Sequence, residues 1–272
     1  MVGRAAAALL AIGDSPTVAL VAQLADGLGI PLAERGRRSR LPVVALLGAP
    51  ATTAEVGTGP PVPACTFAEP PSGSLFEDAP GRAAAGAALY AAWSPVVARA
   101  GRAIAEAGPL RRVDIAVRRP GGTGFPEALA LAAWTLAGQD VGAIIALGEG
   151  HARLTSTTVV AEVDGTVSPR PEWSLQAASD HSVLRLELAP TVSLERNGEP
   201  VPLGDPADED PAVAAARPLG LLGFVDDLRT GALLDPHRWP RGAHPGWGRT
   251  VERLLLAHAA SRARAGAAVP TS

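Results

Sequence analysis

Lysine is absent from this chain of 272 residues, and all 24 basic side chains are arginines. A protein without lysine forms no lysine Schiff base, anchors no pyridoxal phosphate and has no P-loop lysine, so enzymes that depend on these groups are excluded. The single cysteine, Cys65, excludes an internal disulfide and any metal site built from several cysteines. No apolar run approaches the roughly 18 residues that a membrane-spanning helix needs. The sequence therefore predicts a cytoplasmic protein without a signal peptide or a membrane partner.

Charge is nearly balanced, with 24 basic and 27 acidic side chains and a formal net charge of −3. This balance is too even to indicate a nucleic-acid partner. Hydrophobic residues make up 47% of the chain and charged residues 19%, which is typical of a globular protein. We therefore expect one large or two modest domains that act on a small-molecule substrate.

The hydrophobic pattern changes along the chain. The first part predicts helices and single strands in alternation: a helix over 3–12, a strand over 18–21, a helix over 22–28, strands over 41–47 and 64–68, and helical periodicity over 76–107 that is interrupted at Pro95. A strand over 112–118, a Gly-rich turn over 120–124 and a helix over 126–137 follow. The period then becomes two over 141–147, 154–163, 166–167, 182–188 and 192–194, before a closing helix over 250–264. The pattern predicts an α/β domain over 1–92 and an α+β domain over 93–272.

Several short motifs occur in a fixed order. VVALLGAP at 43–50 is a strand that ends in a proline-containing turn, FAEPP follows at 67–71, and YAAWSP at 90–95 precedes GPLRRV at 108–113. The Gly-rich turn and helix end at Gly138, and two hairpin sequences follow, VDGTV at 163–167 and SDHSVLR at 179–185. This ordered set resembles the Gfo/Idh/MocA family of oxidoreductases, to which glucose–fructose oxidoreductase and inositol dehydrogenase belong. The resemblance implies an N-terminal Rossmann domain and a C-terminal domain with helices on one face of an open, mostly antiparallel sheet.

The resemblance also implies where a nicotinamide cofactor would bind. The family's first strand and its G-x-G-x-x-G turn are expected before residue 3, with Gly3 at most the last glycine, so the Rossmann-like domain is expected to be truncated. The acidic residue that binds the ribose is expected after Val21, where the sequence continues Ala-Gln. Both departures predict a protein without a cofactor. NAD(P) binds only under an alternative hypothesis of an atypical site, in which the arginines of residues 35–40 hold a 2′-phosphate.

The family transfers hydride with the help of lysine and histidine as acid and base. The resemblance places Pro70 at the lysine, Glu127 at the histidine and Thr123 at a companion aspartate. No histidine or aspartate occurs between Ile115 and Gln139. The ordinary dehydrogenase chemistry is therefore not expected.

The remaining candidates for chemistry are carboxylates and aromatic side chains. A glutamate in a partly apolar cleft can act as an acid or base near neutral pH, because burial raises its pKa. We assign catalytic roles to Glu127, Glu69 and Tyr90, and substrate-binding roles to Trp93, Thr123 and Trp173. A charge at a helix N-terminus explains Glu127 equally well, a backbone-bonded carboxylate explains Glu69, and core packing explains Tyr90 and Trp93.

Other kinds of site receive little support. Asp235, His237 and His244 are close in sequence but lack a convincing metal-ligand spacing, so no metal is expected. No G-x-S-x-G motif is present, which argues against a serine hydrolase.

Three hypotheses for function remain. The leading one is a non-redox acid/base enzyme, a lyase, isomerase or cyclase, that acts on an intermediate of specialised metabolism. The alternatives are an NAD(P)-dependent oxidoreductase with an atypical cofactor site and a non-catalytic partner of an active paralogue. The resemblance further implies a homodimer or higher homo-oligomer that forms through the C-terminal sheet.

Overall fold

A computed structural model describes most of the chain in two compact units. The described residues are 5–13, 16–35, 37–47, 64–67, 85–88, 90–120, 123–137, 139, 141–203, 220–235, 238–239 and 245–271. Unit 1 comprises Met1–Ser94 and Ala215–Arg249, and unit 2 comprises Pro95–Ala214 and Thr250–Ser272. The first boundary lies two residues beyond the predicted one. The return of residues 215–249 to unit 1 was not predicted.

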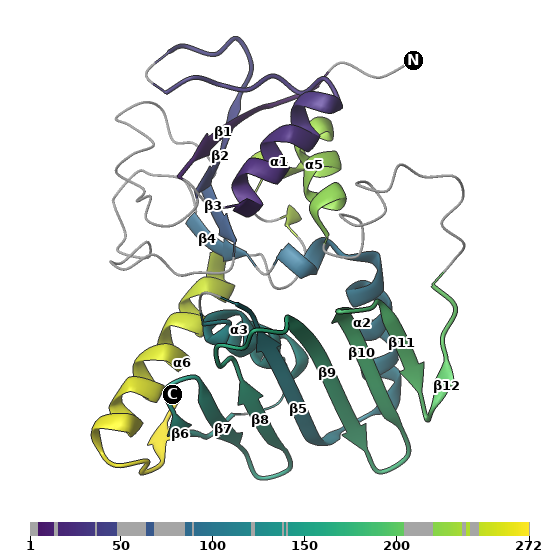
Figure 1. The fold of residues 1–272 in the computed structure, drawn as a ribbon, viewed down its shortest axis with the longest axis vertical. Helices are drawn as coiled ribbons and strands as arrows, with labels where there is room; N and C mark the ends of the chain where they lie inside the picture. Colours follow the sequence, from purple (N-terminus) through teal and green to yellow (C-terminus); the bar gives the residue numbers. More distant parts are fainter. Residues whose placement is uncertain are drawn as a thin grey trace. The chain divides into compact units, whose positions relative to one another are not determined.

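Unit 1 is built on a parallel four-stranded sheet in the order β1-β2-β3-β4 (Figure 1). Its strands are β1 (Ala8–Ile12), β2 (Val43–Leu47), β3 (Ala64–Phe67) and β4 (Ala85–Ala88), and α1 (Pro16–Gly27) follows β1. After α1 the chain passes along the other edge of β1. There Leu32 forms a parallel bridge with Leu9, whose N–H donates to the Pro31 carbonyl at 3.0 Å. A strand–helix–strand unit therefore opens the chain.

Three predictions for this region are wrong. Residues 8–12 form a strand rather than part of a helix over 3–12, and residues 18–21 lie in α1 rather than in a strand. An Ala/Leu run suits a buried helix and a buried parallel strand equally, since neither needs polar positions. In α1, Val18, Val21 and Ala25 are buried at helical spacing, so they form one face of a helix. In the region predicted as helix over 76–107, β4 and a short 3-10 helix over Tyr90–Trp93 precede α2 (Pro95–Ala107).

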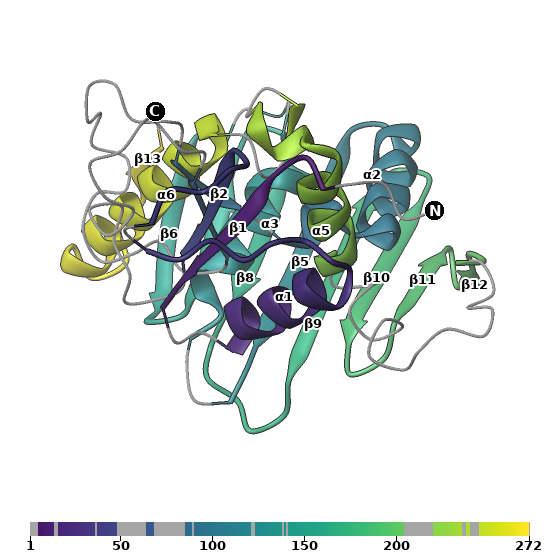
Figure 2. The same ribbon diagram turned by 90° about the horizontal axis from the view of Figure 1, so that it is seen from above.

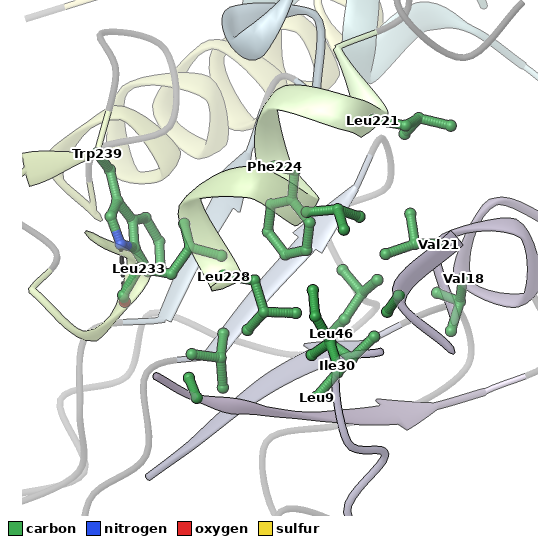
Figure 3. Close-up of a cluster of buried hydrophobic side chains, with 14 residues drawn as sticks. Leu9, Val18, Val21, Ile30, Leu46, Leu221, Phe224, Leu228, Leu233 and Trp239 are labelled. Carbon is green, nitrogen blue, oxygen red and sulfur yellow. Dashed lines mark hydrogen bonds between the residues drawn. The ribbon is translucent and has the colours of Figure 1, made fainter. Parts of the chain in front are cut away.

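The core of unit 1 combines two distant parts of the chain (Figure 3). Helix α5 (Leu221–Thr230) and the 3-10 helix η3 (Ala232–Leu234) come from the returning segment. Their buried side chains pack on those of β1, α1 and β2. Phe224 is fully buried, and the indole N–H of the buried Trp239 donates to the Leu233 carbonyl at 3.0 Å. The members of this core labelled in the figure are Leu9, Val18, Val21, Ile30, Leu46, Leu221, Phe224, Leu228, Leu233 and Trp239.

Unit 2 is built on a nine-stranded sheet in the order β12-β11-β10-β9-β5-β8-β7-β6-β13 (Figure 2). Only the β5–β8 pairing is parallel, so the predicted open, mostly antiparallel sheet is confirmed. Helix α3 packs against β5 and β8, and α2 against β10. The strands are β5 (Leu110–Arg118), β6 (Ala143–Gly148), β7 (His151–Thr155), β8 (Val160–Asp164), β9 (Glu172–Ser179), β10 (Val183–Ala189), β11 (Ser193–Arg196), β12 (Glu199–Pro200) and β13 (Val269–Pro270); the remaining helices are α3 (Phe125–Thr135) and α6 (Pro245–Ala263).

The two faces of this sheet differ in polarity, as strand alternation predicts. On β5, Val113, Ile115 and Val117 are buried, while Arg112 is exposed and Asp114 half-buried between them on the opposite face. β10 repeats the alternation with buried leucines at 184, 186 and 188. The sheet therefore has one apolar, helix-covered face and one polar open face.

Candidate functional site

In unit 1 the strand β1 is followed directly by the helix α1, which is the element order of a nucleotide-binding turn. Gly13 follows β1 with a φ of 100°, a conformation that favours glycine, and α1 begins at Pro16. The carboxyl ends of β1 and β2 are neighbours, because Ile12 pairs with Leu47. The chain leaves β1 toward one edge, at Leu32, and returns at β2 on the other edge. Ligands of open parallel sheets bind at such a switch in strand order.

This arrangement corrects the expected position of the first strand, which does not precede residue 3. The first strand is present as β1, so the sequence to compare with the fingerprint is GDSPTV at 13–18 rather than a segment before residue 3. An acidic residue also follows the segment that pairs with β1. Glu34 lies about 20 residues after Gly13, directly after the segment that pairs with β1. The earlier placement at Val21 failed because residues 18–21 belong to α1.

The residues of this turn fit a dinucleotide in part. Gly13 keeps the first glycine of the fingerprint, while Ser15 and Val18 replace the other two. Val18 is 3% exposed and packs into the core where the fingerprint has glycine. Pro16 at the start of α1 has no N–H to donate to a phosphate. A cofactor bound here would accept fewer hydrogen bonds from backbone N–H groups. Its contacts would come mainly from the Glu34 carboxylate and the neighbouring arginines.

Glu34 lies beside the arginine cluster. Its carboxylate pairs with Arg37, with 2.6 Å between Arg37 Nη1 and Glu34 Oε2, and both side chains are exposed. Arg38 and Arg40 are exposed as well. The carboxylate and the guanidinium groups therefore offer partners for a ribose diol and for a phosphate at the same edge of unit 1.

A second candidate site lies in unit 2, where β5 leads into α3. The Glu127 side chain is 1% exposed, and its Oε2 accepts a hydrogen bond from Arg119 Nη2. Its other oxygen, Oε1, accepts from the indole N–H of Trp173 at 3.0 Å, and Trp173 on β9 is 3% exposed. The fold thus brings together Glu127 and Trp173, which the sequence analysis had assigned to one site.

Two glycines allow the β5–α3 loop to fold so closely on its neighbours. A Cβ on Gly124 would lie 2.0 Å from the Val117 carbonyl oxygen, and a Cβ on Gly165 would lie 2.2 Å from the Phe125 nitrogen. Gly124 N–H and Thr123 Oγ1 both donate to the Gly165 carbonyl at 2.9 Å. The Thr123 hydroxyl also accepts a hydrogen bond from the Phe125 N–H at 3.1 Å, so both of its hydrogen bonds stabilise the backbone around the start of α3.

Arg118, the last residue of β5, and Arg119, the residue after it, contact partners on opposite faces of the sheet. Arg118 Nε donates to Asp164 at 2.9 Å, and Arg118 Nη1 donates to Glu172 at 2.9 Å. Burial raises the pKa of Asp164, but the hydrogen bonds from Arg118 and Thr166 outweigh it and the pKa is lowered overall. Arg119, one residue later, contacts Glu127 instead. Sequence reasoning missed Arg119, although strand alternation implies that neighbouring arginines point to opposite faces.

The sequence matches no protein-family model and none of the curated proteins. Solved structures do resemble this chain. Apo scyllo-inositol dehydrogenase from Lactobacillus casei is 10% identical with a TM-score of 0.65, and the match covers 100% of this chain and 99% of that one. GenD2 from gentamicin A biosynthesis, in complex with NAD, is 13% identical with a TM-score of 0.66 over 99% and 97% of the two chains. The WlbA dehydrogenase from Chromobacterium violaceum, in complex with NADH and UDP-GlcNAcA, is 12% identical with a TM-score of 0.59 over 99% and 97%.

The fold is that of the Gfo/Idh/MocA-type oxidoreductases. The predicted resemblance is thus confirmed for the fold, and identities this low show nothing beyond it. Among the described residues, no helix is both long and apolar enough to cross a bilayer. No group of three or more His, Cys, Asp or Glu side chains gathers as metal ligands in the described part of the chain. His237 and His244 lie outside that part.

The remaining predicted site residues fall into unit 1 or outside the description. The Trp93 indole N–H donates to Asp227 Oδ2 at 2.8 Å, and its ring meets Phe224 edge-on at 5.3 Å. Burial raises the pKa of Asp227, which the hydrogen bond from Trp93 offsets in part. Tyr90 begins the 3-10 helix over Tyr90–Trp93, and its side chain is not among those described. Glu69 lies outside the described residues, so its catalytic role stays a prediction.

Proposed function

We propose that this protein is an NAD(P)-dependent oxidoreductase with an atypical cofactor site. The observation that carries the proposal is the strand–turn–helix–strand unit of β1, Gly13, α1 and the Leu32 bridge, followed by the carboxylate of Glu34. A bound nicotinamide would supply or accept a hydride. The structural neighbours GenD2 and WlbA, which are described in complex with NAD and NADH, support the choice of cofactor class.

In this proposal the residues of unit 1 bind and orient the cofactor. Gly13 lets the backbone approach the pyrophosphate, and Glu34 accepts hydrogen bonds from the ribose hydroxyls. The arginines beside Glu34 favour a 2′-phosphate, so the site can discriminate between NAD and NADP through one carboxylate and its neighbours. Because the carboxylate repels a phosphate, we expect Glu34 to favour NAD.

The non-redox hypothesis keeps one observation in its favour. The chain has no lysine to serve as the family's acid, and the resemblance places Pro70 at that position. An acid/base enzyme that uses Glu127 would need that carboxylate to reach a substrate. The side chain is 1% exposed and both of its oxygens accept hydrogen bonds. We therefore assign to Glu127 the role of positioning Arg119, and we place the non-redox lyase, isomerase or cyclase second.

Calorimetry with NAD⁺, NADH, NADP⁺ and NADPH tests the proposal. We expect binding of at least one of the four, and Glu34→Gln should weaken NAD(H) binding by roughly 10-fold or more, because hydrogen bonds to a charged group contribute about 1.5–3 kcal/mol. NADP(H) binding should be unchanged or stronger. The matched control is Glu199→Gln, at an exposed glutamate of unit 2. Failure of all four nucleotides to bind at millimolar concentration would retire the proposal in favour of the non-redox enzyme or a non-catalytic partner.

For the assembly we propose a homodimer that forms through the open face of the nine-stranded sheet. Both signs of charge alternate there: Arg153 Nε contacts Glu162 at 2.7 Å, and Arg185 Nη2 contacts Glu187 at 2.6 Å. A two-fold axis can place such rows against each other with opposite charges in register. Light scattering after gel filtration should show a dimer that Arg185→Glu with Arg153→Glu converts to a monomer. A wild-type monomer would contradict this assembly.

A further inference from the structure

The guanidinium of Arg119 is engaged along one side only. Arginine carries five N–H donors in a planar fork. Of these, an Nη2 hydrogen contacts Glu127, and the side chain remains 33% exposed. Within the described residues no partner is found for Nε or Nη1 of Arg119. Nη2 keeps a second hydrogen beside either Nε–H or an Nη1 hydrogen, so one two-donor edge of the fork is available to a ligand.

The opposite edge is firmly held. Glu127 is 1% exposed and cannot swing into water without leaving the Trp173 indole, which is itself buried on β9. Next to α3, Gly124 packs against Val117 and Gly165 packs against Phe125 so closely that neither position has room for a Cβ. An arginine fixed in this way loses little side-chain entropy when it binds an anion.

We propose that Arg119 binds the carboxylate of an anionic substrate. The local charge decides between carboxylate and phosphate. The Glu127 carboxylate lies beside the bound anion and repels a dianionic phosphate about twice as strongly as a monoanionic carboxylate at the same distance. A planar monoanion matches the free edge of the fork with two parallel hydrogen bonds. Neighbouring Arg118 adds no attraction, because it contacts Asp164 and Glu172 on the other face of the sheet.

This inference rests on the proposed function only in treating the carboxylate as part of the substrate. We choose glucuronate, glucose and glucose 6-phosphate as probes, because they share a ring and differ in the group at one carbon. Binding is measured by NMR titration of the arginine Nε–Hε resonances without any nucleotide. A failure here is therefore separate from a failure of nucleotide binding.

We expect glucuronate to shift the Arg119 resonance and to bind at least 10-fold more tightly than glucose, with glucose 6-phosphate weaker than glucuronate. The double variant Arg119→Gln/Glu127→Gln, which keeps the buried groups hydrogen-bonded without charge, should remove the preference for glucuronate. Arg170→Gln, at an exposed position of the same unit, should leave it unchanged.

Three results would overturn the proposal. The first is glucuronate binding no tighter than glucose to the wild-type protein. The second is a folded double variant, verified by its near-ultraviolet circular dichroism, that keeps the preference. The third concerns Glu127→Gln alone, which retains the guanidinium and should retain the preference. Loss of the preference in that variant would show that loop structure, and not Arg119, carries the binding.

Discussion

The Arg119–Glu127 pair is asymmetric in burial, and this asymmetry predicts unequal effects of removing either partner. The Glu127 side chain is 1% exposed, whereas that of Arg119 is 33% exposed. Arg119→Gln leaves a buried carboxylate with the Trp173 indole as its remaining charge-stabilising donor. Glu127→Gln leaves a guanidinium that water reaches, and the new amide oxygen still accepts from Trp173. We therefore expect Arg119→Gln to be the more destabilising change.

The magnitudes follow from these environments. Breaking a buried ion pair by removing one partner costs about 3–5 kcal/mol, and the partial exposure of Arg119 lowers this to about 2–4 kcal/mol for Arg119→Gln. Glu127→Gln should cost about 1 kcal/mol, the value of a weakened hydrogen bond. The double variant should cost about 1–2 kcal/mol, less than the sum, because the two residues form one network.

Urea unfolding measures these changes, with tryptophan fluorescence as the signal, because Trp173 and Trp134 are buried in unit 2. The exposed-site variant Arg170→Gln serves as the control and should change the free energy of unfolding by less than about 0.5 kcal/mol. The reasoning is refuted when Glu127→Gln proves as costly as Arg119→Gln, or when the two single effects add without coupling.

Three further predictions concern backbone packing and pH. Gly165→Ala should lower the free energy of unfolding by at least about 1–3 kcal/mol, because the new Cβ would lie 2.2 Å from the Phe125 backbone. Gly27→Ala, where a Cβ would have no neighbour within 4 Å, should be neutral or stabilising by up to about 1 kcal/mol in the same urea assay. Burial raises the pKa of Asp227 above its ordinary value of 3.8, so the wild type should lose stability as the pH rises from about 4 through the folded-state pKa. Asp227→Asn should therefore gain stability relative to wild type over that range, and a stability difference that does not change with pH would contradict this. Burial lowers the pKa of His258, so the wild type should lose stability as the pH falls from about 6.5 through the folded-state pKa, and His258→Gln should flatten that slope in thermal melts.

The fold of unit 2 was largely predictable because its strands alternate strictly. Residues 183–189 and 112–118 present buried apolar side chains at every second position, and a shift of one residue would move them to the other face. An Asn-Gly pair is typical of a tight hairpin turn, and Asn197 and Gly198 both adopt positive φ between β11 and β12. Local chemistry and tertiary structure agree in this half of the chain.

Unit 1 was less predictable because its first strand has no polar positions. Residues 8–12 read Ala-Leu-Leu-Ala-Ile, and only their pairing with residues 43–47 and 32 selects a strand over a helix. That error moved the expected cofactor turn and its acidic residue by more than ten positions along the chain. The candidate site was also predictable only in part. Glu127 and Trp173 were found by residue type, but the choice between Arg118 and Arg119 depends on which face of the sheet each side chain occupies.

The core of unit 1 has a consequence for synthesis on the ribosome. Leu9, Val21 and Leu46 are made early, but Phe224, Leu228 and Trp239, which cover them, are made after most of unit 2 (Figure 3). The nascent chain must therefore keep the apolar face of its first sheet uncovered while roughly 200 residues are added, for about 10–40 s at 5–20 residues per second. Unit 2 can acquire most of its sheet during that interval. Unit 1 therefore begins first on the ribosome but completes its core only after most of unit 2 has been made.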